Sequence, residues 1–256
     1  MNHNPNFYSV IIGTELLNGR RKDAHFAFLN EQLLKRGWTH KASFVIEDDT
    51  NLMKNIFNLI KSDPNSVMFC YGGIGATPDD YTRQIAGEIF TESNMQFHSE
   101  AKDLIENQFG EEAYPHRINM AYLPKGAKLL KNVVNNVPGF YLDDRFFFTP
   151  GFPSMSQSMV IEALDKCYLK NKNEKYRKTL TIFTGENEII DFMKNLPKEI
   201  EASSLPKLID KKRRAVLSLA SYDEKLLDSY FKKAQEYLDE KKIEYVLKDL
   251  FESNQA

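Results

Sequence analysis

The sequence predicts an α/β fold with an open, mostly parallel sheet in three layers, followed by a small α+β domain. Two observations carry this prediction. Over about the first 170 residues, short apolar runs alternate with segments of helical periodicity, the pattern of a parallel sheet with right-handed crossovers. After the polar stretch 170–175, the pattern changes to several strands and one long helix. We therefore expect two domains, 1–170 and 176–256, joined by a linker.

The first strand is predicted at residues 7–12, a short apolar run. Asp23 can cap the helix that follows, and Gly37 stops it. A second strand is expected at 39–46. The apolar positions of the helix follow helical spacing, at Phe26, Leu29, Leu33 and Leu34.

Thr50 opens a second helix, which must close before Pro64, and the third strand follows at 66–71. Further helical patterns lie at about 80–90 and 99–109, whereas 110–123 shows no clear periodicity. The apolar side of the second helix carries Met53, Ile56, Phe57 and Ile60.

The last strand of the first domain is predicted at 145–149, with Ser154 as the N-cap of a helix that runs to about residue 170. The second domain is expected to contain one short and one long helix and three strands. The helices are at about 186–196 and 223–242, and the strands are at 178–183, 200–208 and 215–221.

The most informative motif is a glycine cluster directly after the third predicted strand. Three of the twelve glycines, Gly72, Gly73 and Gly75, lie within four residues. Glycines accept positive φ and have no Cβ to hold a ligand away, and a following helix directs free N–H groups at an anion. An ordinary strand-to-helix turn is the alternative. The hydroxyl of Thr77 and the carboxylates that follow favour a phosphate-binding loop.

Asp79 and Asp80 place two carboxylates beside this loop. Carboxylates near a pyrophosphate are best explained by a bridging divalent cation, which prefers hard oxygen ligands. We expect Mg²⁺, Mn²⁺ or Co²⁺ there, with Asp80 as the first candidate ligand. The alternative for Asp80 is a simple N-cap of the helix at 80–90, and one residue can do both. Glu15 follows the first strand and can orient a water as a general base, or be an ordinary surface glutamate.

Composition excludes several classes of function. A net charge of −2 and a pI near 6.3 give no electrostatic basis for nucleic-acid binding. The two cysteines, Cys70 and Cys167, lack a partner pattern and are expected to be reduced thiols, as in the cytosol. The start of the chain is polar, and no apolar stretch approaches the roughly 18 residues needed to span a bilayer. We expect a cytoplasmic protein that does not contact membranes.

Three segments in order, residues 12–19, residues 72–83 and Pro150-Gly151-Phe152-Pro153, make the chain resemble the molybdopterin-binding domain family. The resemblance is closer to its CinA-type branch (competence/damage-inducible protein A) and covers about the first 165 residues. Departures from the pattern of the branch are Ala76, where proline is usual, Tyr71, where threonine is common, and His25, where asparagine is frequent.

The resemblance implies a molybdopterin-binding-domain-like fold with a small second domain and a homo-oligomeric assembly. It implies that Asp80 handles metal and substrate, and it favours a functional Glu15. Asp23 and His25 match a polar position that faces the ligand. Their alternatives are a helix cap and an incidental histidine. Gly151 and Pro153 resemble a second loop that lines the pocket, or a rigid turn.

Together these points predict a metal-assisted hydrolase of the pyrophosphate of ADP-ribose or a related dinucleotide. Asp80, Glu15 and Asp23 are the predicted catalytic residues. The alternative is a non-catalytic protein that binds molybdopterin, another pterin phosphate or a nucleotide. A third possibility, an interaction protein with an empty pocket, is disfavoured by the retained glycines and aspartates. The resemblance does not extend to the C-terminal deamidase domain that many CinA-type proteins carry, so we do not expect nicotinamide-nucleotide deamidation.

Overall fold

The structure is a computed structural model that describes residues 5–172 and 175–251. Its internal contacts divide the chain between Asn171 and Lys172 into two units, each of which is described by itself. Of the predicted domains and linker, residues 1–4, 173–174 and 252–256 lie outside the described residues.

A six-stranded sheet forms the centre of the first unit, in the order β2-β1-β3-β8-β7-β6. The first four strands run parallel, and β7 and β6 add an antiparallel edge, which confirms an α/β fold with a mostly parallel sheet. Because Ile11 pairs with Tyr71 and Tyr71 with Thr149, β1, β3 and β8 end almost level. The strands are β1 (Asn6–Ile12), β2 (His40–Ile46), β3 (Ser66–Tyr71), β6 (Lys128–Leu130), β7 (Gly139–Leu142) and β8 (Phe146–Thr149).

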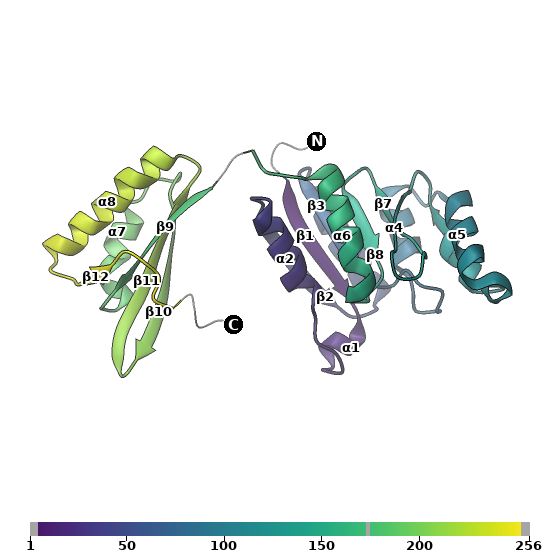
Figure 1. Cartoon of the computed structure of the whole chain (residues 1–256), viewed down its shortest axis with the longest axis horizontal. Helices are drawn as coiled ribbons and strands as arrows, with labels where there is room; N and C mark the ends of the chain where they lie inside the picture. The colour runs from purple at the N-terminus through teal and green to yellow at the C-terminus, as the bar shows by residue number, and fades with distance from the viewer. Residues whose placement is uncertain (1–4, 173–174, 252–256) are drawn as a thin grey trace. The chain divides into compact units, whose positions relative to one another are not determined.

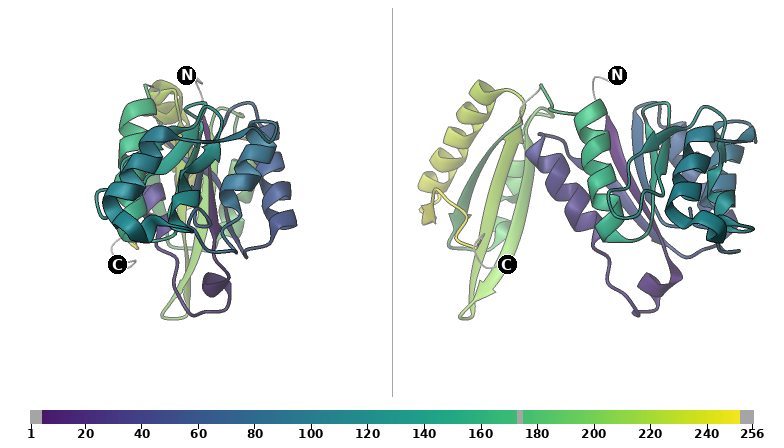
Figure 2. Two further views of the ribbon diagram at one scale, coloured as in Figure 1. Left: turned by 90° about the vertical axis from the view of Figure 1, so that its right-hand side faces the viewer. Right: turned by 45° about the vertical axis from the view of Figure 1, so that its right-hand side comes forward.

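Helices cover both faces of this sheet, which completes three layers (Figures 1 and 2). Alternate strand residues point to opposite faces, so Phe7 joins one apolar core and Tyr8 the other. The core around Phe7 includes α2 (His25–Lys35) and α6 (Pro153–Cys167). The core around Tyr8 includes α3 (Thr50–Ser62), α4 (Thr82–Phe90) and α5 (Ser99–Phe109).

Short elements fill the segments whose sequence had no clear period. The stretch 110–123 forms two 3-10 turns and a short strand, too brief to show a repeating apolar pattern. The short elements of the first unit are α1 (Thr14–Leu17), β4 (Met95–Phe97), η1 (Gly110–Ala113), η2 (Arg117–Ala121) and β5 (Tyr122–Pro124), with β4 and β5 antiparallel.

Two sequence expectations about helices are wrong. Ser154 does not cap α6, because this helix begins at Pro153, a residue that fits the first helical turn, and it ends at Cys167. Phe26 and Leu34, predicted on the apolar side of α2, are 43% and 58% exposed, whereas Leu29 and Leu33 are fully buried in the core on this face of the sheet.

The second unit is a four-stranded antiparallel sheet in the order β10-β11-β9-β12, and its apolar core includes helical residues. Asp223 caps the long helix by accepting a hydrogen bond from the Leu226 N–H at 3.0 Å. The helix predicted at 186–196 is a 3-10 turn followed by a short α-helix. The elements are β9 (Tyr176–Ile182), η3 (Glu186–Ile189), α7 (Ile190–Lys194), β10 (Glu201–Ile209), β11 (Lys212–Ser221), α8 (Glu224–Glu240) and β12 (Tyr245–Val246).

Membrane spans and disulfides are both absent from the described part of the chain. No helix there has the length and apolarity to cross a bilayer. Cys70 is a buried free thiol and Cys167 a half-buried one.

His40 makes stability depend on pH. Its ring stands 5.2 Å from that of Phe26, and neither ring nitrogen finds a hydrogen-bond partner among the described residues. Burial lowers the pKa of His40 from its usual 6.5 to about 4. Below pH 6.5 the unfolded chain therefore takes up a proton more readily than the folded one, and stability falls until about pH 4.

We expect His40→Phe to flatten this dependence, because phenylalanine fills the same space and cannot be protonated. Melting temperatures of parent and variant at pH 7.5, 6.0, 5.0 and 4.5 measure the effect. His116→Phe changes an exposed histidine and should leave the parental pH dependence in place. Equal slopes for parent and His40→Phe would show that His40 does not contribute.

Candidate functional site

The glycine loop after β3 adopts a backbone that only glycine fits. Gly72 and Gly73 have φ of +96° and +68°. A Cβ on Gly72 would lie 2.5 Å from the carbonyl oxygen of Ile12, and one on Gly73 would lie 2.2 Å from Thr82 Oγ1. The loop therefore packs directly against β1 and the start of α4.

Buried side chains hold the carbonyl groups of this loop. Thr82 Oγ1 donates to the Gly72 carbonyl and the Thr82 N–H to the Gly73 carbonyl, both at 3.0 Å. The guanidinium of Arg83, a residue that is 5% exposed, donates to the Gly75 carbonyl at 2.6 Å. Thr82 and Arg83 lie inside the segment 72–83, on which the family resemblance rests. Their residue types alone did not reveal that they hold the loop carbonyl groups.

The N–H groups of the same peptides point the other way. In a trans peptide the N–H is antiparallel to the carbonyl, so those of Gly73, Ile74 and Ala76 face away from the anchors. These three groups and the N–H of Gly75 make no hydrogen bond within the described residues. Unpaired successive N–H groups form an anion-binding concavity.

Asp80 closes this loop and does not cap α4. Its Oδ2 accepts the Thr77 N–H at 2.8 Å and also the Thr77 hydroxyl. The helix begins at Thr82 after Tyr81, with no side-chain cap. The capping alternative for Asp80 is therefore wrong.

Two other loops reach the same edge of the sheet. After β1, the Thr14 N–H and hydroxyl donate to Asp48, which follows β2, at 3.0 and 2.8 Å. After β8, a Cβ on Gly151 would lie 3.3 Å from Gly72 Cα. The carboxyl ends of four neighbouring strands thus meet here, the usual ligand position in open parallel sheets.

These loops surround a cavity of about 490 Å³. Most of the residues predicted for the site line it. They are Glu15, Gly72, Gly73, Gly75, Thr77, Asp79, Asp80 and Gly151.

Asp23, His25 and Pro153 are not among the lining residues. The carboxylate of Asp23 accepts the N–H groups of His25 and Phe26 at 2.8 and 3.1 Å, so it serves the start of α2. Pro153 is the first residue of α6.

His25 lies behind the second loop instead of facing a ligand. It is 5% exposed and stacks on Tyr71 with ring centres 4.3 Å apart. Nε2 is 3.3 Å from the Gly151 carbonyl, and Nδ1 is 3.2 Å from Ser156 Oγ. Burial lowers the pKa of His25, although the Gly151 carbonyl and Asp23 act in the opposite direction. A neutral ring that donates from Nε2 and accepts at Nδ1 satisfies both contacts and holds Gly151 in place.

Sequence reasoning missed the apolar wall and several polar groups of the cavity. Asp48 could have been found, because it follows a predicted strand at the same sheet edge as Glu15. The others come from loops, from segments without a readable pattern, or from the ends of helices, as Phe109 and Met155 do. The missed lining residues include Arg21, Asp48, Phe109, Met120, Asn132, Asn135, Val137, Phe152 and Met155.

The carboxylates that line the cavity fit a cation that is also bound by a ligand. No group of three or more His, Cys, Asp or Glu side chains in the described residues is arranged to hold a metal by itself. Mg²⁺ is commonly held by one or two carboxylates together with substrate phosphates, and Asp79 and Asp80 offer that number. The carboxylates lining the cavity also leave a ligand phosphate in need of a compensating positive charge.

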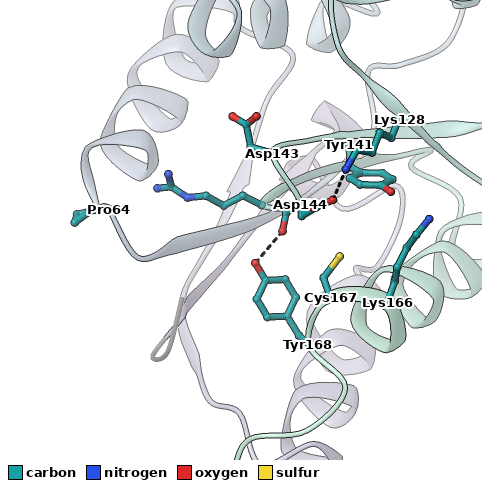
Figure 3. Close-up of a pocket in the computed structure, with 9 residues that line it drawn as sticks. Pro64, Lys128, Tyr141, Asp143, Asp144, Lys166, Cys167 and Tyr168 are labelled. Carbon is teal, nitrogen blue, oxygen red and sulfur yellow. Dashed lines mark hydrogen bonds and ion pairs between the residues drawn. The ribbon is translucent and has the colours of Figure 1, made fainter. Parts of the chain in front are cut away.

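A second cavity, of about 420 Å³, lies at the opposite ends of β8 and α6 (Figure 3). Its charged groups largely satisfy one another. Lys128 Nζ pairs with Asp144 at 2.9 Å, and the Tyr168 hydroxyl donates to the Asp144 carbonyl at 2.9 Å. Lys166 interacts with the Tyr141 hydroxyl, which raises the pKa of Lys166. We therefore place the candidate site in the first cavity.

The fold and this cavity define the class of protein, an open α/β domain with a cavity at the carboxyl ends of its parallel strands. Residues 9–168 match the family described as a probable molybdopterin binding domain, and the chain belongs to this family and to its CinA-type branch. The crystal structure of CinA from Thermoplasma acidophilum, described as having unknown function, is 25% identical with a TM-score of 0.54. The matched region covers 64% of this chain and 98% of the Thermoplasma chain.

Relatives of this chain differ in length. A CinA-like protein of Sulfurihydrogenibium is 28% identical over 211 residues, which are 78% of this chain and 52% of the relative. A protein of Caldivirga maquilingensis is 30% identical over 165 residues, 61% of this chain and 63% of its own. The chain thus spans less than two thirds of these relatives. A Pyrococcus furiosus protein, 26% identical over 250 residues, matches 92% of this chain and 96% of its own length.

Proposed function

We propose that this protein hydrolyses the pyrophosphate of ADP-ribose or a related dinucleotide with the help of a divalent cation. The observation that carries the proposal is the row of unpaired N–H groups from Gly73 to Ala76 at the wall of the cavity. Such a row binds a phosphate through hydrogen bonds that are set before the ligand arrives.

The remaining walls fit the rest of a nucleotide. Phe152 and Met155 offer apolar surface for a ring, and the Nδ2 of Asn135, which makes no hydrogen bond within the described residues, can donate to a ligand. The two asparagines are held in place, because Asn132 Nδ2 donates to Asn135 Oδ1 at 2.6 Å. A cavity lined by both polar groups and apolar side chains suits a phosphate ester of a planar heterocycle.

In this proposal the carboxylates and the N–H groups of the glycine loop have separate roles. Asp79 and Asp80 would hold the cation, which when bound lowers the pKa of water and stabilises charge on phosphate oxygens. The loop N–H groups balance the charge that builds up on the attacked phosphate. Glu15 lines the cavity and orients the attacking water, and Asp23 keeps its structural role.

The alternative function is binding of molybdopterin or a nucleotide without turnover. The engagement of Asp80 Oδ2 by Thr77 favours it, since a carboxylate used to close a loop has less capacity for a cation.

One assay separates the two functions. The protein is incubated with ADP-ribose and Mg²⁺, Mn²⁺ or Co²⁺, with a chelator as control, and the products are separated by chromatography. Water addition to one phosphorus gives AMP and ribose 5-phosphate, and their cation-dependent appearance supports hydrolysis. Calorimetric binding without products supports the alternative. If ADP-ribose is neither bound nor converted to products, the hydrolase proposal is contradicted.

A further inference from the structure

The charges that line the cavity are strongly unbalanced. Among the described lining residues Arg21 is the only cationic side chain, against the carboxylates of Glu15, Asp48, Asp79 and Asp80. Two of these carboxylates are engaged locally, Asp48 by Thr14 and Asp80 by Thr77. An anionic ligand therefore meets one mobile positive side chain of the protein.

Arg21 is fixed through its backbone, and its guanidinium is held only by partly exposed contacts. Its N–H donates to the Glu15 carbonyl at 3.0 Å. Its guanidinium lies 3.7 Å from Glu15 Oε1 and 5.3 Å from the centre of the Phe152 ring, and the side chain is 55% exposed. An exposed ion pair at this distance is weak, so the guanidinium can leave Glu15 at little cost.

A phosphate is the better partner for this side chain. The planar guanidinium fork matches two oxygens of a phosphate, and such charge-assisted pairs are stronger than a single long contact to an exposed carboxylate. The glycine loop already provides N–H groups for one phosphate. Arg21 lines the same cavity from the loop after β1, so it can reach a second phosphate of the same ligand.

We propose that Arg21 binds the second phosphate of the ligand and makes the site selective for diphosphates over monophosphates. This inference rests on the proposed function. It also assigns a consequence to Glu15: when Arg21 moves to the phosphate, the Glu15 carboxylate loses its partner and becomes available to a water.

ADP and AMP are suitable probes, because they share the same base and sugar and differ in one phosphate. Binding of both to the full chain is measured by calorimetry with and without Mg²⁺, for the parent, Arg21→Gln and Arg20→Gln. Arg20 is the matched control: it is an exposed neighbour on the same loop, bonded to Asn18, and it does not line the cavity. Both variants remove one charge, and neither removes a buried contact.

We expect Arg21→Gln to weaken ADP about 10-fold or more and AMP less than about 3-fold, the range for loss of one charge-assisted pair. Arg20→Gln should change both by less than about 2-fold. The dependence of ADP affinity on salt should become shallower in Arg21→Gln alone. Arg21→Lys keeps the charge without the fork and should recover part of the ADP affinity.

Unchanged ADP binding by Arg21→Gln, or equal weakening of ADP and AMP, overturns the diphosphate role of Arg21. Either result leaves the phosphate loop itself intact, because the parent still binds. A parent that binds neither probe, with or without Mg²⁺, overturns this inference together with the phosphate-site proposal on which it rests.

Discussion

Replacing Asp80 by asparagine should lower the turnover of ADP-ribose about 100-fold or more, the scale of a charge-stabilising or water-positioning group. The side-chain oxygen of asparagine can still accept the Thr77 N–H, so the loop remains closed. The substitution removes the charge that a cation requires. Melting temperature and hydrolysis across a Mg²⁺, Mn²⁺ and Co²⁺ series measure the two effects side by side.

Two further variants make this comparison decisive. Asp80→Ala removes the acceptor for both Thr77 donors and should lower the melting temperature as well as turnover. Asp223→Asn makes the same chemical change at the N-cap of α8 in the second unit and should affect neither. If Asp80→Asn hydrolyses ADP-ribose as fast as the parent at every cation concentration, Asp80 only closes the loop and the metal-assisted mechanism is wrong.

Gly73→Ala should weaken nucleotide binding by at least about 10-fold, one lost charge-assisted contact or more. Its new Cβ would lie 2.2 Å from Thr82 Oγ1, and Thr82 is fully buried, so the loop must move away. The positive φ adds roughly 1–2 kcal/mol of backbone strain. Calorimetry with ADP and thermal unfolding record the loss of affinity and of stability.

Gly19→Ala separates the effect of backbone strain from that of the steric clash with Thr82. Gly19 has a φ of +78°, close to that of Gly73, but no atom lies within 4 Å of its Cβ position. This variant should lose a similar amount of stability to strain and keep its affinity for ADP. Full ADP affinity in a folded Gly73→Ala protein would contradict the loop as the phosphate site.

The sequence predicted those parts of the molecule in which one residue type has one physical use. Clustered glycines after an apolar run have few explanations, and Gly72 and Gly73 have the positive φ values that were expected. Aspartate has several uses. Asp80 was considered as a helix cap, but its bonds to Thr77 depend on how the loop turns back, which composition does not reveal.

The apolar wall of the cavity could not be predicted for a different reason. Phe109 ends α5 and Met120 lies in η2, and the two are brought to the cavity by tertiary packing, with no periodic pattern pointing at them. His25 was predicted as a ligand contact from family resemblance. It is buried under Gly151, because a polar residue at a helix start can serve a neighbouring backbone as easily as a ligand.

The antiparallel edge of the sheet has a consequence for how such a site can diversify. The glycine loop depends on the register of β1, β3 and β8, which fixes it to the centre of the fold. Asn132 and Asn135 instead lie in the connection between β6 and β7, at the sheet's margin. A connection at the margin of a sheet varies more readily than the strands that it joins. Under the proposed function, this connection is therefore the part of the cavity in which ligand preference can change while the glycine loop is kept.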